Sequence, residues 1–403
     1  MSGGLYVHVP FCLTRCGYCD FNSYSGLGYL RSRYARALSA EADLAAPAWV
    51  RESFVSVFLG GGTPTMLDTE DLVAVLAHMR SRFDITDDAE ATIEANPDTV
   101  NEAKLSALRI AGYTRLSVGV QSFDARVLAL LGRVHSPASA RCAYAAARAA
   151  GFANVNVDLI YGAEGETLES WRETLAETVA LGSEHISAYA LTVEQDTPFG
   201  RAVAAGAKPA PDSDLQADMF ALACEALATA GYGHYEVSNW AKPGFECRHN
   251  LGYWRRRPYL GLGAGAHSFR GGHRWWNICS PEVYLRAVEG GCLPTEGEEV
   301  LGAAEVRTEE LLLGLRAREG VVAVEVDAEV AARFVTEGLL ARRNGSYVLT
   351  ERGMFLANDV VVALSGRPPG VDRQGDRPQE RLDRDFVQEP LLSIRGRADP
   401  HSG

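Results

Sequence analysis

Short apolar runs alternate with amphipathic stretches along the first half of the chain. The runs have the composition of strands and span residues 5–9, 54–59, 91–95, 115–120, 155–160 and 185–190. The stretches between them carry apolar residues at helical spacing, at 29–46, 69–83, 101–111, 123–131, 138–150 and 168–181. Strands that alternate with helices are typical of a parallel sheet, so the pattern predicts six strand–helix repeats in an α/β fold.

Six repeats are two short of a closed eight-stranded barrel. We therefore expect a partial, open (β/α)6 barrel over residues 1–232, including a further helix at 212–230. In such barrels the ligand site lies at the C-terminal ends of the strands. The Trp-, Gly- and Arg-rich residues 233–300 are interpreted as a linking segment.

The remaining residues predict a second, smaller unit. Helical patterns at 309–318 and 326–337 precede a hairpin pattern around Asn344-Gly345, which together predict a winged-helix-like α+β domain over 301–365. Residues 366–403 are rich in Pro and Gly, with mixed charge and few apolar anchors, so we expect a disordered tail.

Composition narrows the function classes. A net charge of −13 argues against a nucleic-acid partner, although winged helices often bind DNA. No apolar run approaches the roughly 20 residues that span a bilayer, and no secretory signal pattern opens the chain, so we expect a cytoplasmic protein without an integral membrane segment. Eight scattered cysteines fit a reducing compartment better than a disulfide framework.

Three of these cysteines, Cys12, Cys16 and Cys19, fall in one loop directly after the first predicted strand. A structural zinc site wants four ligands, usually as two separated pairs. An iron–sulfur cluster can be held by three cysteines with one iron left open to another ligand. The local trio therefore favours a cluster, and a zinc knot is the alternative.

The C-x3-C-x2-C spacing, with Tyr18 before the third cysteine, resembles the cluster loop of radical S-adenosylmethionine (SAM) enzymes. The resemblance implies a radical SAM barrel whose [4Fe–4S] cluster is bound by Cys12, Cys16 and Cys19. It also implies that SAM chelates the fourth iron, that its reductive cleavage gives a 5′-deoxyadenosyl radical, and that an electron donor is needed.

The glycine-rich turn at residues 60–65 follows a predicted strand, and its lack of side chains would let the backbone approach a ligand closely. By itself it is equally well a tight strand-to-helix turn. With the cysteine loop it resembles the turn that holds the amino group of SAM. The resemblance implies a SAM pocket formed by Tyr6, Tyr18, Gly61, Gly62, Thr63, Glu94, Gln121, Arg133, Asp158 and Ala190.

Longer motifs, at residues 6–12, 60–65, 119–123 and 158–162, resemble the oxygen-independent coproporphyrinogen III oxidase group. The chain departs from the true oxidases at Phe21, where they have a further cysteine, and in the short stretch before the cysteine loop. Both departures resemble the HemW-type haem chaperones, and so does the His-Asn-x-x-Tyr-Trp motif at 249–254.

That resemblance implies a protein that binds haem, requires the cluster and SAM, and delivers haem to acceptor proteins such as membrane respiratory enzymes. His249 is the candidate haem contact, because an imidazole can be an axial ligand; a satisfied core histidine is the alternative. Tyr253 and Trp254 could pack on the porphyrin, and the arginines at 255–257 could pair with propionates. Cys247 is a possible second contact.

Two functions stay open at this point. The first is the haem chaperone, in which no residue is assigned a catalytic role. The second is an enzyme, an oxygen-independent coproporphyrinogen III dehydrogenase that converts propionate side chains to vinyl groups. The barrel, cluster and SAM pocket support both, whereas Phe21 counts against the enzyme.

Overall fold

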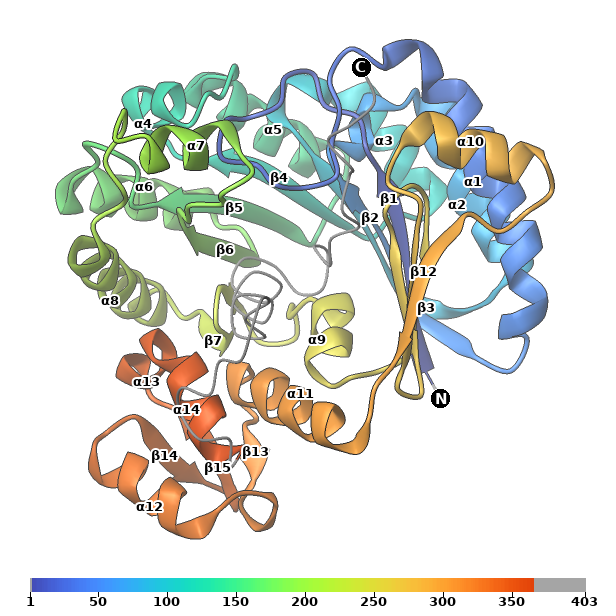
Figure 1. Ribbon diagram of the computed structural model, residues 1–403. Coiled ribbons are helices and arrows are strands. Elements are labelled where there is room, and N and C mark those ends of the chain that lie inside the picture. The colour runs from blue at the N-terminus through green and yellow to red at the C-terminus, as the bar shows by residue number, and fades with distance from the viewer. Residues whose placement is uncertain (1, 366–403) are drawn as a thin grey trace.

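The computed structural model describes residues 2–365 (Figure 1). Consecutive parallel strands form the predicted barrel: β1 (Ser2–Val9), β2 (Ser53–Gly61), β3 (Asp84–Ala95), β4 (Arg115–Gln121), β5 (Val155–Tyr161) and β6 (His185–Ala190). The helices between them lie along the outer side of the curved sheet: α1 (Arg31–Ala45), α2 (Thr69–Arg82), α3 (Glu102–Ala111), α4 (Ala125–Leu130), α5 (Pro137–Ala149) and α6 (Leu168–Leu181). The predicted α/β fold with six repeats is confirmed.

Local signals set the helix boundaries. Asn101 caps the N-terminus of α3, because its side chain accepts a hydrogen bond from the backbone N–H of Lys104 at 2.9 Å. Gly112 ends the same helix with a φ of 104°, a left-handed conformation that costs glycine little. Helices α7 (Pro198–Ala204) and α8 (Ser213–Thr229) follow β6.

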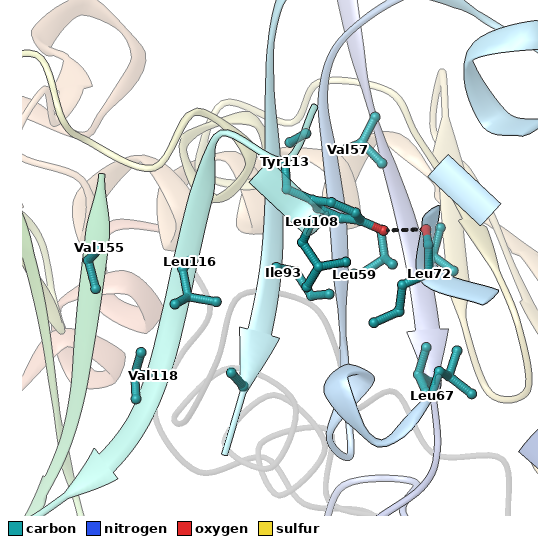
Figure 2. Close-up of a cluster of buried hydrophobic side chains, with 14 of the residues drawn as sticks. Val57, Leu59, Leu67, Leu72, Ile93, Leu108, Tyr113, Leu116, Val118 and Val155 are labelled. Atoms are coloured by element: carbon teal, nitrogen blue, oxygen red, sulfur yellow. Dashed lines mark hydrogen bonds between the residues drawn. The ribbon is translucent and has the colours of Figure 1, made fainter. Parts of the chain in front are cut away.

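The main core lies between the sheet and these helices (Figure 2). Alternate strand residues such as Val57, Leu59 and Leu116 point towards the helix layer, where Leu72 of α2 and Leu108 of α3 lie. These five side chains are fully buried. Each such side chain contributes about 1.5–3 kcal/mol through burial. Because strand side chains alternate, the residues between them point to the inside of the barrel.

Residues 233–300 are not a linker but extend the barrel sheet at both edges. β7 (Gly233–Glu236) and β8 (Asn239–Ala241) lie beyond β6, and β9 (Tyr259–Leu262) pairs with β1 in parallel. Three antiparallel strands then follow β9 in a 12-stranded sheet: β10 (His267–Arg270), β11 (His273–Asn277) and β12 (Thr295–Val300). The segment also contains α9 (Arg248–Trp254) and α10 (Pro281–Glu289).

The C-terminal unit has the predicted helices and hairpin. Its elements are α11 (Ala303–Arg316), β13 (Val321–Val322), α12 (Ala328–Thr336), β14 (Leu340–Arg343), β15 (Ser346–Leu349), α13 (Glu351–Phe355) and α14 (Ala357–Leu364). The β14–β15 turn places Asn344 and Gly345 at positive φ, as a two-residue hairpin requires. The core of this unit includes Tyr253 and Trp254 of α9, so the C-terminal unit packs directly against residues 233–300.

No helix between residues 2 and 365 is long and apolar enough to cross a membrane. The predicted disordered tail, residues 366–403, lies outside the described residues.

Candidate functional site

The cysteine loop connects β1 to the helices that follow and is closed by backbone hydrogen bonds. Cys12 N–H donates to the carbonyl of Tyr24 at 3.0 Å, and Tyr24 N–H donates to the carbonyl of Pro10 at 2.7 Å. Asn22 then ties the loop to the rest of the sheet, because its amide donates to the carbonyls of Ala264 and Cys279 at 2.9 and 3.0 Å. The loop is therefore held in place by the protein itself.

One cavity of about 170 Å³ lies at the C-terminal ends of the barrel strands. Every residue that the sequence predicts for the cluster and the SAM pocket, except Tyr6, lines it. The lining set comprises Cys12, Cys16, Tyr18, Cys19, Gly61, Gly62, Thr63, Glu94, Gln121, Arg133, Asp158 and Ala190. These residues come from all parts of the barrel, and the fold brings them together.

The glycine turn lies directly against the cysteine loop. Gly62 N–H donates to the carbonyl of Val9 at 2.9 Å, and Thr63 N–H donates to the carbonyl of Phe11 at 2.8 Å. A Cβ atom at Gly62 would lie 2.8 Å from the Phe11 oxygen and 3.0 Å from the sulfur of Cys12. Glycine at this position therefore allows a backbone approach that any side chain would prevent.

Arg133 connects the loop to strand β4. Its guanidinium donates to the sulfur of Cys16 at 3.5 Å and to the carbonyl of Gly119 at 3.1 Å. The Tyr18 ring packs nearby against a small apolar cluster that includes Leu131 and Leu191. Burial raises the pKa of the Tyr18 hydroxyl, so this residue offers the cavity an uncharged ring.

Two carboxyl groups form the inner wall of the cavity. Glu94 accepts a hydrogen bond from Gly61 N–H at 3.1 Å, and Asp158 accepts from Ser117 and Asn156, both at 2.7 Å. Burial raises the pKa of both groups, and the charge of Asp158 adds to the rise at Glu94. Both retain oxygen lone pairs that could accept hydrogen bonds from a ligand.

The cysteines fit a cluster. All three line the same cavity. Between residues 2 and 365, no three His, Cys, Asp or Glu side chains surround a single point as one metal ion would need. A [4Fe–4S] cluster takes one thiolate at each of three irons, which requires thiols spaced around a cavity.

A second cavity of about 40 Å³ lies deeper in the barrel and shares Glu94 and Asp158 with the first. The structure places Tyr6 and His249 here. Tyr6 is 1% exposed, and its hydroxyl lies 2.9 Å from Nδ1 of His8. His8 Nε2 faces the carbonyl of Asn22, which can only accept, so Nδ1 is unprotonated and the Tyr6 hydroxyl donates to it.

His249 is a buried residue with two hydrogen-bond partners. Its Nδ1 lies 2.9 Å from the Ser56 hydroxyl and its Nε2 lies 2.9 Å from the Tyr253 hydroxyl. The ring stacks on Phe58, and burial lowers its pKa to about 3. In this arrangement neither ring nitrogen is open to an iron, so ligation would require α9 to move.

The other predicted haem contacts are also engaged. Arg255 forms an ion pair with Glu319, and Arg256 pairs with Glu309 at 2.7 Å and with Glu310 at 3.1 Å, so neither stands ready for a propionate. Tyr253 and Trp254 are buried in the second core rather than displayed at a surface. Cys247 is fully buried, and its S–H donates to Glu90 at 3.5 Å.

Several residues in and around the two cavities were not predicted from the sequence. Ser117 and Tyr189 line both cavities, and Asn156 and Arg115 line the inner one. They share one signal, a polar residue at an inward position of an otherwise apolar parallel strand. Such a residue is costly to bury without a purpose, so this pattern could have identified them.

Taken together, the open (β/α)6 barrel and the three-cysteine cavity define a radical SAM protein. The family model of the Radical SAM superfamily matches residues 6–178. The solved structure of coproporphyrinogen III oxidase (HemN) from Escherichia coli covers 90% of both chains with a TM-score of 0.77, and at 23% identity this likeness shows the fold alone.

Curated relatives narrow the class. The chain is 45% identical to the heme chaperone HemW of Mycobacterium tuberculosis over 90% of its own length and 95% of that protein. It is 33% identical to the heme chaperone HemW of Bacillus subtilis, over 90% of this chain and 98% of the relative. The chain therefore belongs to the HemW family.

Proposed function

We propose that this protein is a haem chaperone, which binds haem and passes it to acceptor proteins. The observation that carries the proposal is the 45% identity to a heme chaperone across almost the whole of both chains. Phe21, which stands where the true oxidases have a further cysteine, supports the same choice. We further infer that the protein works in the cytoplasm and meets membrane-bound acceptors through peripheral contacts.

The cluster is proposed to bind at Cys12, Cys16 and Cys19, next to Arg133. When bound, it would supply an open iron for SAM and the electron for SAM cleavage. The chain's own residues would hold SAM: Gly61 to Thr63 by close backbone approach, Arg133 by its charge, and Glu94 and Asp158 by accepting hydrogen bonds. The cavity walls would keep bulk water from the bound ligand.

Anaerobic reconstitution tests the cluster assignment. Cys12→Ala should lose most of the bound iron and sulfide, because only two thiolates remain in the loop. Cys142→Ala is the matched control, since Cys142 is exposed on α5 and away from the cavity. Equal iron content in the two variants would remove Cys12 from the ligand set.

We propose that haem contacts α9, with His249 as the iron ligand after α9 has moved. Tyr253→Phe removes the hydroxyl that occupies Nε2, so haem affinity should stay the same or rise. His249→Phe keeps a ring that can stack on Phe58 but offers no nitrogen, so affinity should fall at least about tenfold. Equal haem affinity in wild type and His249→Phe, measured by absorbance titration, would exclude the assignment.

The alternative function is that of a coproporphyrinogen III dehydrogenase, which the likeness to the HemN fold also allows. Reconstituted protein should be given reductant, SAM and coproporphyrinogen III under anaerobic conditions. We expect no protoporphyrinogen and no released CO2. Turnover by protein with an intact cluster would make the chain an oxidase and overturn the chaperone assignment.

A further inference from the structure

Helix α9 is capped by side chains from other elements rather than by its own. Its N-cap residue is Cys247, whose side chain makes no cap hydrogen bond. Glu90 of β3 accepts from the backbone N–H of Arg248 at 3.1 Å and from that of His249 at 3.2 Å. The N–H of Cys247 donates to the hydroxyl of Tyr235 at 3.3 Å.

These contacts matter because the start of α9 is buried. Cys247 is 0% exposed, His249 3% and Glu90 6%, whereas Arg248 between them is exposed, so water is kept from the Cys247 and His249 amides rather than from the whole first turn. Backbone N–H groups left unpaired in such a place are costly. A carboxylate at a helix N-terminus also gains from the helix dipole. Glu90 therefore holds the first turn of α9 to the barrel wall.

Arg115 completes the surroundings of Glu90. It is 2% exposed and lies within electrostatic range of both Glu90 and Asp158. Its Nε atom has no hydrogen-bond partner among the described residues, and the side chain lines the inner cavity beside His249. Both oxygens of Glu90 therefore accept hydrogen bonds from α9. The charge of Arg115 lies near Glu90 but forms no ion pair with it among the described residues.

The docked position of α9 is closed to haem. Both nitrogens of His249 are occupied, and the cavity beside its ring, at about 40 Å³, is far too small for a porphyrin. A ligand that binds only an open state has its affinity reduced by the fraction of molecules in that state. If haem binds only when α9 has moved, the bonds that hold α9 docked lower the apparent affinity for haem.

We propose that Glu90 is a latch on α9, which keeps the His249 motif docked in the barrel and limits haem uptake until it is released. Glu90, Thr92 and Glu94 lie on the same face of β3, so one strand carries both the latch and a wall of the main cavity. This proposal rests on the proposed function, because it assumes that haem contacts α9.

The first test is amide hydrogen exchange in the full chain. Glu90→Gln retains one acceptor and turns an amide towards a donor, so exchange at Arg248 and His249 should rise roughly tenfold or more. Asp87→Asn is the matched control: it makes the same charge change on the same strand, at an exposed side chain outside the contacts that hold α9. Equal exchange in both variants would overturn the latch.

A rescue variant separates the latch from general damage. Serine is a favourable N-cap residue, so adding Cys247→Ser to Glu90→Gln should restore protection at the first turn of α9. If Glu90→Gln does not fold, Tyr235→Phe tests the same contact set, and its faster exchange should be confined to the Cys247 amide. No change in exchange in Tyr235→Phe would contradict this attachment of α9.

The second test is haem titration. A latch predicts that Glu90→Gln binds haem roughly tenfold more tightly than wild type, whereas Asp87→Asn binds like wild type. A residue that merely supports the fold would give weaker binding, and unchanged or weaker haem binding with a loosened α9 would overturn the proposal. If wild type does not bind haem, the proposed function is wrong. The hydrogen-exchange comparison would still decide whether Glu90 holds α9.

Discussion

The guanidinium of Arg133 lies 3.5 Å from the sulfur of Cys16, although 117 positions separate the two residues in the chain. The same side chain also donates to the carbonyl of Gly119 at 3.1 Å. One arginine therefore joins the cysteine loop at one side of the main cavity to strand β4 at the other.

Replacing Arg133 should weaken SAM binding. Arg133→Met keeps the length of the side chain but removes the charge beside the cavity, so we expect an increase in Kd of at least about tenfold. Anaerobic equilibrium dialysis with SAM measures it. Arg126→Met is the control, since Arg126 is exposed, pairs with Asp124 and does not line the cavity. Wild-type affinity in Arg133→Met would argue that the cavity holds SAM without this residue.

Two glycines of the site should respond differently to alanine. Gly62→Ala forces a methyl group against the Phe11 oxygen and the Cys12 sulfur, so we expect a loss of about 1–3 kcal/mol in stability and less bound iron after reconstitution. Gly17→Ala lies in the cysteine loop with nothing within 4 Å of the added atom, and it should behave like wild type. Thermal unfolding and iron analysis decide, and equal losses in the two variants would contradict the packing argument.

Glu41 of α1 should make stability depend on pH. It is fully buried and accepts hydrogen bonds from Gly263 N–H at 2.7 Å, Asn277 at 2.6 Å and Tyr284 at 2.6 Å. Burial raises its pKa from 4.5 to about 7. An acid whose pKa is raised by folding contributes stability that is fully present below its unfolded pKa, and that contribution is lost as pH rises through the folded value.

Wild type should therefore lose roughly 3 kcal/mol of unfolding free energy from this group between pH 4.5 and 7. Glu41→Gln should lack that part of the slope, although it is less stable at each pH because one donor loses its acceptor. Urea unfolding across this range measures the difference. Glu289→Gln is the control: Glu289 is an exposed acid whose pKa is lowered by Arg33, so its titration falls below the window.

The C-terminal unit should depend on one buried ion pair. Arg274 of β11 pairs with Glu309 of α11, and both side chains are less than 10% exposed. Arg274→Met leaves part of the Glu309 charge uncompensated, so we expect a loss of about 3–5 kcal/mol and faster proteolysis near residue 301. Arg333→Met removes an exposed partner of Glu337 and of the Phe334 ring, and it should cost less than about 1 kcal/mol. Similar proteolysis of both variants would contradict this role of the pair.

The alternation of apolar strands and amphipathic helices was sufficient to predict the barrel. The individual residues of the main cavity, such as Gly62 and Asp158, were implied by the resemblance to radical SAM enzymes, and the meeting of parallel strand ends at one edge explains why they lie together. The edge strands were missed because their pairing leaves little local trace. β12, for example, reads Thr-Glu-Gly-Glu-Glu-Val and is mostly exposed.

The surroundings of His249 could not be predicted for a different reason. A histidine near aromatic residues can be either an iron ligand or a buried core residue, and only its hydrogen-bond partners distinguish the two. The partners Ser56 and Glu90 lie on strands far upstream, and no local pattern around residue 249 predicts their contacts with it. The pairing of Arg255 with Glu319 depends in the same way on the turn after α11, 64 positions later in the chain.

The position of residues 233–300 in the sheet has a consequence for how the protein is made. The outer edge of β1 is covered by β9, and that of β6 by β8, and both covering strands emerge from the ribosome after all six barrel strands. Until then the growing chain has two unpaired strand edges, which are templates for aggregation. The barrel can reach its final form only after about residue 262 has been synthesised, so the slow, long-range closure of β1 by β9 is the step at which a newly made chain is most exposed to misassembly.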